Sequence, residues 1–332
     1  MVSDDALRAA LESALGRESG EPARIEQLDR FPSEYSSSFA IEELEVVIQG
    51  GGPLRLIFKD LSWRALIDAA RDVRPSFLYD PIREISMYRD VLSSTQLGTA
   101  AYYGSHIDEA AGTYWLFLEH VASAKLCHVG NFAHWQRVAR WLAGMHVQLA
   151  GASGRLRLIR YDRAYYREWL ERARKQLTEI DPSGYPCADA RQVATLVRNY
   201  ESVIDRLASS WHAVIHGDFY CGNILLQEGE SGLRICPIDW ETAAFGPALM
   251  DLAALASGNW DDAQRSALFT AYREALTEHG VTPPGIDEIT RTVDCCRIHQ
   301  ALQWIGWARN WTAPPDQAND WFAELLHVSA RL

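Results

Sequence analysis

The sequence has a deficit of positive charge, and this deficit excludes one large class of proteins. Its 332 residues include 32 Lys and Arg against 44 Asp and Glu, for a net charge of −12. Nucleic-acid-binding proteins gather basic residues to contact phosphates, so we expect no nucleic-acid partner. The densest basic stretch alternates with glutamates, as on a helix face laced with ion pairs. This stretch contains Arg167, Glu168, Glu171, Arg172, Arg174 and Lys175.

Long apolar runs and paired cysteines are also missing. No continuous apolar segment has the length of a bilayer span, and Asp4 and Asp5 stand where a secretory signal would carry basic residues. The six cysteines show none of the CxxC spacing of zinc and redox sites, so we expect reduced thiols. These absences favour a soluble, cytoplasmic protein with no membrane partner. A chain that is 48% hydrophobic can bury a large core, and its length favours two lobes.

The most informative segment that is present is polar. His216 to Asn223 reads HGDFYCGN, and Asp239 follows in CPIDWE. Asp218 can orient an acceptor hydroxyl and take its proton, while Asn223 and Asp239 offer the hard oxygen ligands that Mg²⁺ on nucleotide phosphates prefers. These residue types also fill ordinary turns and strand ends, but the complete pattern favours a phosphoryl-transfer site.

Two short apolar runs lie between Asn223 and Asp239. Ile224 to Leu226 and Leu233 to Ile238 have the pattern of buried strands on either side of a turn. A hairpin of this kind would bring the Asn223 and Asp239 side chains together. The sequence therefore predicts a metal site at the ends of the hairpin.

The segments HGDFYCGNILL and IDWETAAFGPALMDLAAL resemble the aminoglycoside phosphotransferase and choline kinase group, which are small-molecule kinases with a protein-kinase-like fold. The resemblance is specific from Ile215 to Leu255. It implies a two-lobed α+β fold with a small β-rich N-terminal lobe and a larger, mostly helical C-terminal lobe. It implies that Asp218 is the catalytic base and that Asn223 and Asp239 bind the metal. It also implies that Asp251 is a structural carboxylate that braces the catalytic loop.

A kinase also needs an upstream lysine for the α and β phosphates of the nucleotide. Leu54 to Lys59 has the pattern of a strand that is entered from the glycine-rich turn Gly50 to Pro53. Lys59 is therefore the candidate for the phosphate lysine. A solvated lysine at a strand end is the alternative.

A glutamate on a following helix should pair with this lysine. Pro81 to Leu92 has apolar residues at helical spacing, and Pro81 suits the first turn. Glu84 is the candidate because it would share the inward face of Tyr88. A solvated glutamate is the alternative, and Asp90 is a second acidic residue on the same helix.

The expected nucleotide-covering loop departs from the protein-kinase pattern, because Pro32 to Phe39 contains no glycine. Its serines, including Ser36 and Ser37, can offer hydroxyls and backbone N–H groups to phosphate. They do not allow the close backbone approach that glycine permits. An ordinary polar hairpin loop is the alternative, and the choice between ATP and GTP stays open.

The organisation of the chain changes near residue 119. Residues 1–118 have the pattern of a helix, Asp4 to Leu15, followed mainly by strands, whereas residues 119–332 are mainly helical. The first long helix of the second part, Phe132 to Leu149, has a wide apolar face that includes His146. The resemblance implies an interlobe hinge at this point, with backbone groups of Glu119 and Val121 facing the adenine edge. Residues 1–118 would then bind the nucleotide, and residues 119–332 would carry the catalytic residues and bind the acceptor.

The acceptor-binding region is the part that the sequence determines least. Trp304, Trp307 and Trp311 fall at i, i+3 and i+7 on one helix face, with Arg297 and His299 at least one turn earlier. Such a stripe suits an aromatic wall for an amine or a sugar, but it is more often buried core. Acidic residues near the same end fit either a cationic acceptor or a solvated face. They are Asp261, Asp262, Asp316, Asp320 and Glu324.

The sequence thus predicts ATP-dependent or GTP-dependent O-phosphorylation of a small molecule, with Mg²⁺ as cofactor. The acceptor would be an aminoglycoside-like antibiotic, an amino sugar, a choline-like amine or another hydroxylated natural product. The alternative is a kinase-like regulatory protein that holds nucleotide or ligand but transfers no phosphate. The absence of glycine from the loop Pro32 to Phe39 favours this alternative. The presence of all four polar site residues opposes it; they are Lys59, Asp218, Asn223 and Asp239.

Overall fold

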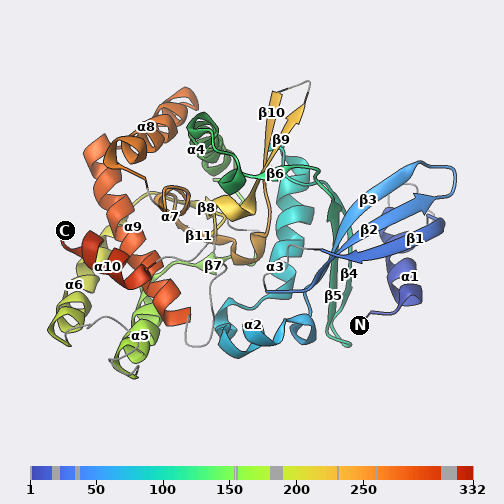
Figure 1. Ribbon diagram of the computed structural model, residues 1–332, viewed down its shortest axis with the longest axis horizontal. Helices are drawn as coiled ribbons and strands as arrows, with labels where there is room; N and C mark the ends of the chain where they lie inside the picture. Colours follow the sequence, from blue (N-terminus) through green and yellow to red (C-terminus); the bar gives the residue numbers. More distant parts are fainter. Residues whose placement is uncertain are drawn as a thin grey trace. The chain divides into compact units, whose positions relative to one another are not determined.

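The computed structural model describes residues 2–16, 23–33, 38–152, 154, 156–179, 190–229, 232–258, 260–307 and 320–331. The chain forms two compact units. Unit 1 comprises Met1–Ser123 and Gln227–Glu241, and unit 2 comprises Ala124–Leu226 and Thr242–Leu332. Unit 1 is built on a sheet and unit 2 mainly from helices, which confirms the predicted α+β fold (Figure 1). The division after residue 118 into a nucleotide-binding and a catalytic lobe stays a prediction.

Unit 1 contains an antiparallel sheet of five strands in the order β1-β2-β3-β5-β4. In β2, the buried Leu44 and Val46 alternate with the exposed Glu45, so one face of the sheet is apolar. This face packs in one core cluster with Leu7 and Leu11 of α1 (Asp4–Leu15). The strands are β1 (Ile25–Pro32), β2 (Ile41–Ile48), β3 (Pro53–Asp60), β4 (Tyr102–Asp108) and β5 (Thr113–Glu119).

Helix α1 has the bounds that the sequence predicts. Ser3 caps its N-terminus by accepting a hydrogen bond from the Ala6 N–H at 3.3 Å. The helix approaches β4 closely at Gly104, where a Cβ atom would lie 2.5 Å from Cβ of Ala14. Gly104 also has a φ of +148°, so a side chain at this position would clash and strain the backbone.

The helix predicted for Pro81 to Leu92 is regular only in its first half. Helix α3 (Pro81–Ser86) follows α2 (Asp68–Val73) and begins with Asp80 accepting a hydrogen bond from the Ile82 N–H at 3.0 Å. The chain then widens into a π-helical turn, η3 (Met87–Val91), and ends in a short 3₁₀ turn. Apolar spacing does not distinguish an α-helical from a π-helical turn, which is why the sequence did not predict this change.

Helices make up most of unit 2, and α9 runs through its core (Figure 1). The adjacent Cys295 and Cys296 of α9 are both buried and contribute to the packing of this helix. The helices are α4 (Phe132–Gln148), α5 (Arg163–Glu179), α6 (Ala190–Ser209), α7 (Leu249–Leu255), α8 (Asp262–Glu278), α9 (Ile286–Trp307) and α10 (Trp321–Ser329). Over the ranges that the structure describes, we find no helix with the length and apolar character that a bilayer crossing requires.

Short strands position the polar motif. β8 (His212–Ile215) pairs with β11 (Ala244–Pro247), which also pairs with β7 (Ile159–Arg160). The polar motif starts directly after β8 and ends at β9 (Ile224–Gly229). β9 lies between β10 (Gly232–Pro237) and β6 (Ala124–Lys125) in a second small sheet, which confirms the predicted strand pair.

Candidate active site

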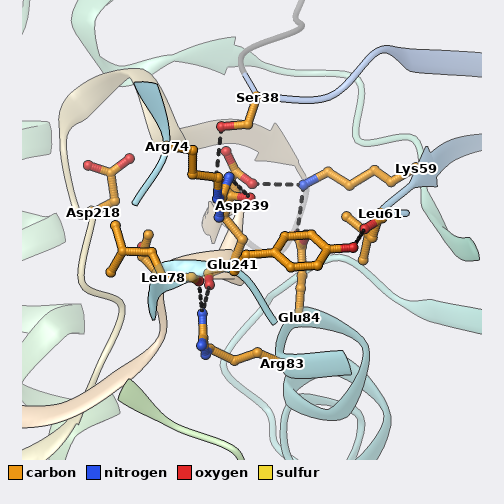
Figure 2. A network of polar contacts seen from close by, with 12 residues as sticks. Ser38, Lys59, Leu61, Arg74, Leu78, Arg83, Glu84, Asp218, Asp239 and Glu241 are labelled. Atoms are coloured by element: carbon orange, nitrogen blue, oxygen red, sulfur yellow. Dashed lines mark hydrogen bonds and ion pairs between the residues drawn. The ribbon is translucent and has the colours of Figure 1, made fainter. Parts of the chain in front are cut away.

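Three charged side chains of unit 1, here called the lysine cluster, meet at one point. They are Lys59, Glu84 and Asp239. Nζ of Lys59 lies 2.7 Å from Oε1 of Glu84 and 3.0 Å from Oδ1 of Asp239 (Figure 2). Lys59 comes from β3, which is held between β2 and β5, and its side chain is only 7% exposed. The pairing of Lys59 with Glu84 is the arrangement that the sequence predicted, and the role of both residues in nucleotide binding stays a prediction.

The lysine cluster keeps a positive charge on Lys59. Burial opposes that charge, but the carboxylates of Asp239 and Glu84 outweigh the effect and raise the pKa of Lys59. Burial raises the pKa of Glu84, while the charge of Lys59 acts in the opposite direction. Oε2 of Glu84 is buried and has no hydrogen-bond partner among the residues described. A charged lysine in this setting can neutralise an anionic ligand such as a phosphate chain.

Asp239 has an unusual backbone. Its φ is +68°, and it is the only residue other than glycine with a positive φ in the described part of the chain. Asp tolerates this left-handed conformation better than most residues, because its short side chain can hydrogen-bond locally. Its side chain is 19% exposed, so solvent and ligands can reach it. An accessible carboxylate is the kind of hard oxygen donor that suits Mg²⁺.

The polar motif, His216 to Asn223, lies in unit 2 between β8 and β9. Nδ2 of Asn223 donates hydrogen bonds to the Asp218 carboxylate at 2.9 Å and to the Asp218 backbone carbonyl at 3.0 Å. The Asn223 N–H also donates to the Tyr220 carbonyl at 2.9 Å, which closes a 3₁₀ turn. The amide nitrogen of Asn223 thus orients Asp218, and its amide oxygen is a hard donor that fits Mg²⁺. Whether Asn223 and Asp239 share one metal stays a prediction.

Asp251 of α7 braces the loop that carries the polar motif, as the resemblance implied. Its carboxylate accepts hydrogen bonds from the backbone N–H groups of His216, at 2.8 Å, and Gly217, at 2.9 Å. Only glycine fits at position 217, where φ is +83° and a Cβ atom would lie 2.3 Å from the Thr242 carbonyl oxygen. The His216 side chain is buried, and its Nδ1 lies 3.3 Å from the Asp218 backbone N. His216 is therefore a structural residue of the loop.

His146 and Tyr272 extend this support beyond Asp251. His146 of α4 is fully buried, with Nδ1 2.9 Å from the hydroxyl of Tyr272 and Nε2 3.2 Å from Oδ2 of Asp251. The sequence assigned His146 only to the apolar face of its helix. A polar residue on such a face was the available signal, but its partners lie far away in the chain.

The predicted hinge residues take part in sheet and ion-pair contacts of unit 1. The Glu119 N–H donates to the Ala101 carbonyl at 2.9 Å, and the Glu119 carboxylate pairs with Arg234 at 2.7 Å. Val121 is buried, and its carbonyl accepts a hydrogen bond from the Ser123 hydroxyl at 3.0 Å. The backbone contacts of Glu119 and Val121 with adenine stay a prediction. Ser36 and Ser37 lie outside the described residues.

The two described tryptophans of the α9 stripe, Trp304 and Trp307, contact two different helices. Trp307 stacks on Trp169 of α5 at 6.1 Å between ring centroids, whereas Trp304 stacks on Trp321 of α10 at 5.3 Å. Nε1 of Trp304 also donates to the Tyr220 hydroxyl at 2.9 Å. Both indoles therefore take part in helix packing in unit 2. Trp311 lies outside the described residues.

Several of the acidic residues considered for acceptor binding have structural roles. Asp261 and Asp320 cap the N-termini of α8 and α10. Glu324 pairs with the buried Arg297 at 2.6 Å. Asp262, which is 84% exposed, lies 3.8 Å from Arg265, and Asp316 lies outside the described residues.

Comparison with known proteins shows the family to which the chain belongs. The model of the phosphotransferase enzyme family, APH, matches residues 70–288. Among curated proteins, none matches the chain significantly. Solved structures that resemble this one include small-molecule kinases of several kinds.

The choline/ethanolamine kinase family protein from Mesorhizobium loti is 19% identical, with 92% of this chain and 86% of that chain covered and a TM-score of 0.55. The microcompartment-associated aminopropanol kinase is 13% identical, with coverage of 92% and 90% and a TM-score of 0.59. The GDP complex of wild-type aminoglycoside 2′-phosphotransferase-IIIa is 12% identical, with coverage of 96% of each chain and a TM-score of 0.55. At these identities the likeness shows a shared protein-kinase-like fold. Since the family model covers most of the sequence, the chain belongs to the phosphotransferase enzyme family.

Proposed function

We propose that the protein transfers the γ-phosphoryl group of ATP, or of GTP, to a hydroxyl group of a small molecule. The observation that carries this proposal is the lysine cluster of unit 1. A buried, charged lysine lies between a buried glutamate and an accessible aspartate. A phosphotransferase needs such a fixed cation for the nucleotide phosphates and a nearby carboxylate for their metal ion.

Each residue of the proposed site has one task. Lys59 binds the nucleotide phosphates, and Glu84 holds Lys59 in place. Asp239 and Asn223 bind Mg²⁺, which when bound neutralises charge on the phosphates. Asp218 orients the acceptor hydroxyl and accepts its proton. The acceptor oxygen then forms a bond to the γ phosphorus, the bond from that phosphorus to the β–γ bridging oxygen breaks, and the nucleoside diphosphate leaves.

The acceptor that we propose is a hydroxylated amine, such as an amino alcohol, an amino sugar or an aminoglycoside. The net charge of −12 supports this class, because an acidic protein attracts cations through its long-range field. The names of similar structures point to the same class, since they include choline/ethanolamine, aminopropanol and aminoglycoside kinases.

Turnover of nucleotide over a panel of acceptors tests the proposal. The purified protein is incubated with Mg²⁺ and either ATP or GTP, and with hydroxylated amines, sugars or neither. We expect acceptor-dependent release of nucleoside diphosphate and an acceptor product that is heavier by one phosphoryl group. Binding of nucleotide without phosphorylation of any acceptor would favour the regulatory alternative.

A further inference from the structure

Glu241, two residues after Asp239, contacts three separate segments of unit 1. Its carboxylate accepts hydrogen bonds from Nη1 of Arg74 at 3.0 Å and from the Ser38 hydroxyl at 3.1 Å. Its backbone carbonyl accepts one from Nη1 of Arg83 at 2.6 Å (Figure 2). The side chain of Arg74 is only 2% exposed, so this ion pair is shielded from solvent. A shielded, hydrogen-bonded ion pair fixes geometry even where its net contribution to stability is small.

The residue between Asp239 and Glu241 is anchored as well. The Trp240 side chain is fully buried, and its Nε1 donates to the Pro237 carbonyl at 3.2 Å. The Trp240 backbone N–H donates to Oε1 of Glu84 at 3.3 Å, and the same oxygen accepts from Lys59. The backbone that follows Asp239 is therefore tied to the carboxylate that holds Lys59.

These contacts hold the backbone of Asp239 in its left-handed conformation. A non-glycine residue at a φ of +68° is held in a sparsely populated conformation, which persists only where the surrounding contacts enforce it. Arg83, which holds the Glu241 carbonyl, lies next to Glu84 on α3. The same short helix thus fixes both sides of the contact between Lys59 and Asp239.

We infer that Glu241, together with Arg74, is a positioning residue for Asp239. The pair holds the chain after Asp239, sustains its left-handed backbone and keeps its carboxylate directed at Lys59. Because the Glu241 carboxylate is paired with Arg74 and Ser38, its effect on a bound Mg²⁺ would be exerted through the position of Asp239. The consequence for Mg²⁺ rests on the proposed function, whereas the effect on the backbone does not.

The first test measures the backbone directly, by hydrogen exchange of the Trp240 amide in the full-length protein without ligand. We expect exchange to be at least about tenfold faster in Glu241→Ala and in Arg74→Met than in the wild type, because local opening is easier once an anchor is lost. Asp68→Asn is the matched control. This variant removes the ion pair between Asp68 and Arg71 on α2, the helix that precedes Arg74. Since the Asp68 side chain is 92% exposed, the variant should leave exchange of the Trp240 amide unchanged. Unchanged exchange in both folded test variants overturns the inference.

The second test measures the Mg²⁺ concentration that gives half-maximal turnover at saturating ATP. We expect it to rise at least about tenfold in Glu241→Ala and in Arg74→Met, and the double variant to lose little more than either single one. Glu241→Gln keeps an acceptor oxygen for Arg74 and should remain within about threefold of wild type. A Glu241→Gln protein as impaired as Glu241→Ala, with Arg74→Met unimpaired, would show direct metal ligation and overturn the inference. If the variants change hydrogen exchange of the Trp240 amide as expected but the wild type shows no turnover, only the proposed function is overturned.

Discussion

The imidazole of His146 lies against the carboxylate of Asp251, with Nε2 3.2 Å from Oδ2 and both side chains buried. The two carboxylate oxygens of Asp251 accept hydrogen bonds from the backbone N–H groups of His216 and Gly217, at the start of the polar motif. The contact therefore connects α4 to the loop through one carboxylate. Because the His216 N–H is buried and Asp251 is its acceptor, loss of the Asp251 carboxylate would affect both the fold and the loop.

Asp251→Asn should destabilise the protein and impair turnover. An amide offers one acceptor oxygen where the carboxylate offers two, so one buried N–H group loses its partner at a cost of about 1–3 kcal/mol. Urea unfolding measures this loss. Asp205→Asn is the control, since Asp205 pairs with Arg163 on the surface and is 64% exposed, and it should change stability by no more than about 0.5 kcal/mol. Equal stability of Asp251→Asn and wild type would contradict the bracing role.

Asp218→Asn should lower turnover by about two to four orders of magnitude, the usual contribution of a positioned base. The Asn side chain keeps the size of Asp but loses the carboxylate that would take the acceptor proton. Nucleotide affinity should be nearly unchanged, because Asp218 is assigned to the acceptor hydroxyl and not to the nucleotide. Steady-state kinetics with calorimetric nucleotide titration checks both parts, and a variant of comparable activity would remove Asp218 from the mechanism.

Asp239→Asn should lower Mg²⁺-dependent turnover strongly while the fold persists, because the variant loses the charged ligand and keeps only a neutral amide oxygen. Asn is the better variant than Ala here, since Asn also tolerates the left-handed backbone at a φ of +68°. Without nucleotide, circular dichroism and thermal melting should resemble wild type. The stabilisation by Mg²⁺ and ATP should be much smaller than in the wild type, because a ligand that binds the folded state more weakly stabilises it less. Normal stabilisation by Mg²⁺ and ATP would place the metal elsewhere, and an unfolded variant would mark Asp239 as structural.

The protein should become acid-labile through His299. This residue of α9 is fully buried, with Nδ1 2.7 Å from the Tyr200 hydroxyl, and burial lowers its pKa from 6.5 to about 3. A depressed folded-state pKa contributes stability that is present above pH 6.5 and is lost as the pH falls toward 3, because the unfolded chain binds the proton first.

We therefore expect the wild type to lose about 3 kcal/mol more than His299→Gln between pH 6.5 and pH 4. Gln stays neutral over this range and can still accept from Tyr200. Urea unfolding at the two pH values measures the difference. His327→Gln, at an exposed histidine of α10, is the matched control and should follow the wild type. If His299→Gln also followed the wild type, the buried imidazole would not be the acid-sensitive group.

Local patterns in the sequence were enough to predict much of the fold. The helix from Asp4 to Leu15 and the strand that ends near Lys59 follow from apolar periodicity and from capping residues, which act over a few neighbouring positions. The polar motif from His216 to Asn223 was also visible, because its residues are close together in the chain. The pairing of Lys59 with Glu84 could be predicted only through the resemblance to kinases.

Tertiary structure alone decided which distant side chains support the site. Arg74 and Glu241 are 167 positions apart, and His146 and Asp251 are 105 apart, so no periodic pattern connects them. The left-handed backbone of Asp239 was equally invisible, since Asp adopts this conformation only where its neighbours enforce it. The sequence by itself determined which polar residue types the candidate site contains and many of the helices and strands that carry them. The packing of those elements determined which charges are shielded, paired and held in place, because burial and distance arise only when the chain is folded.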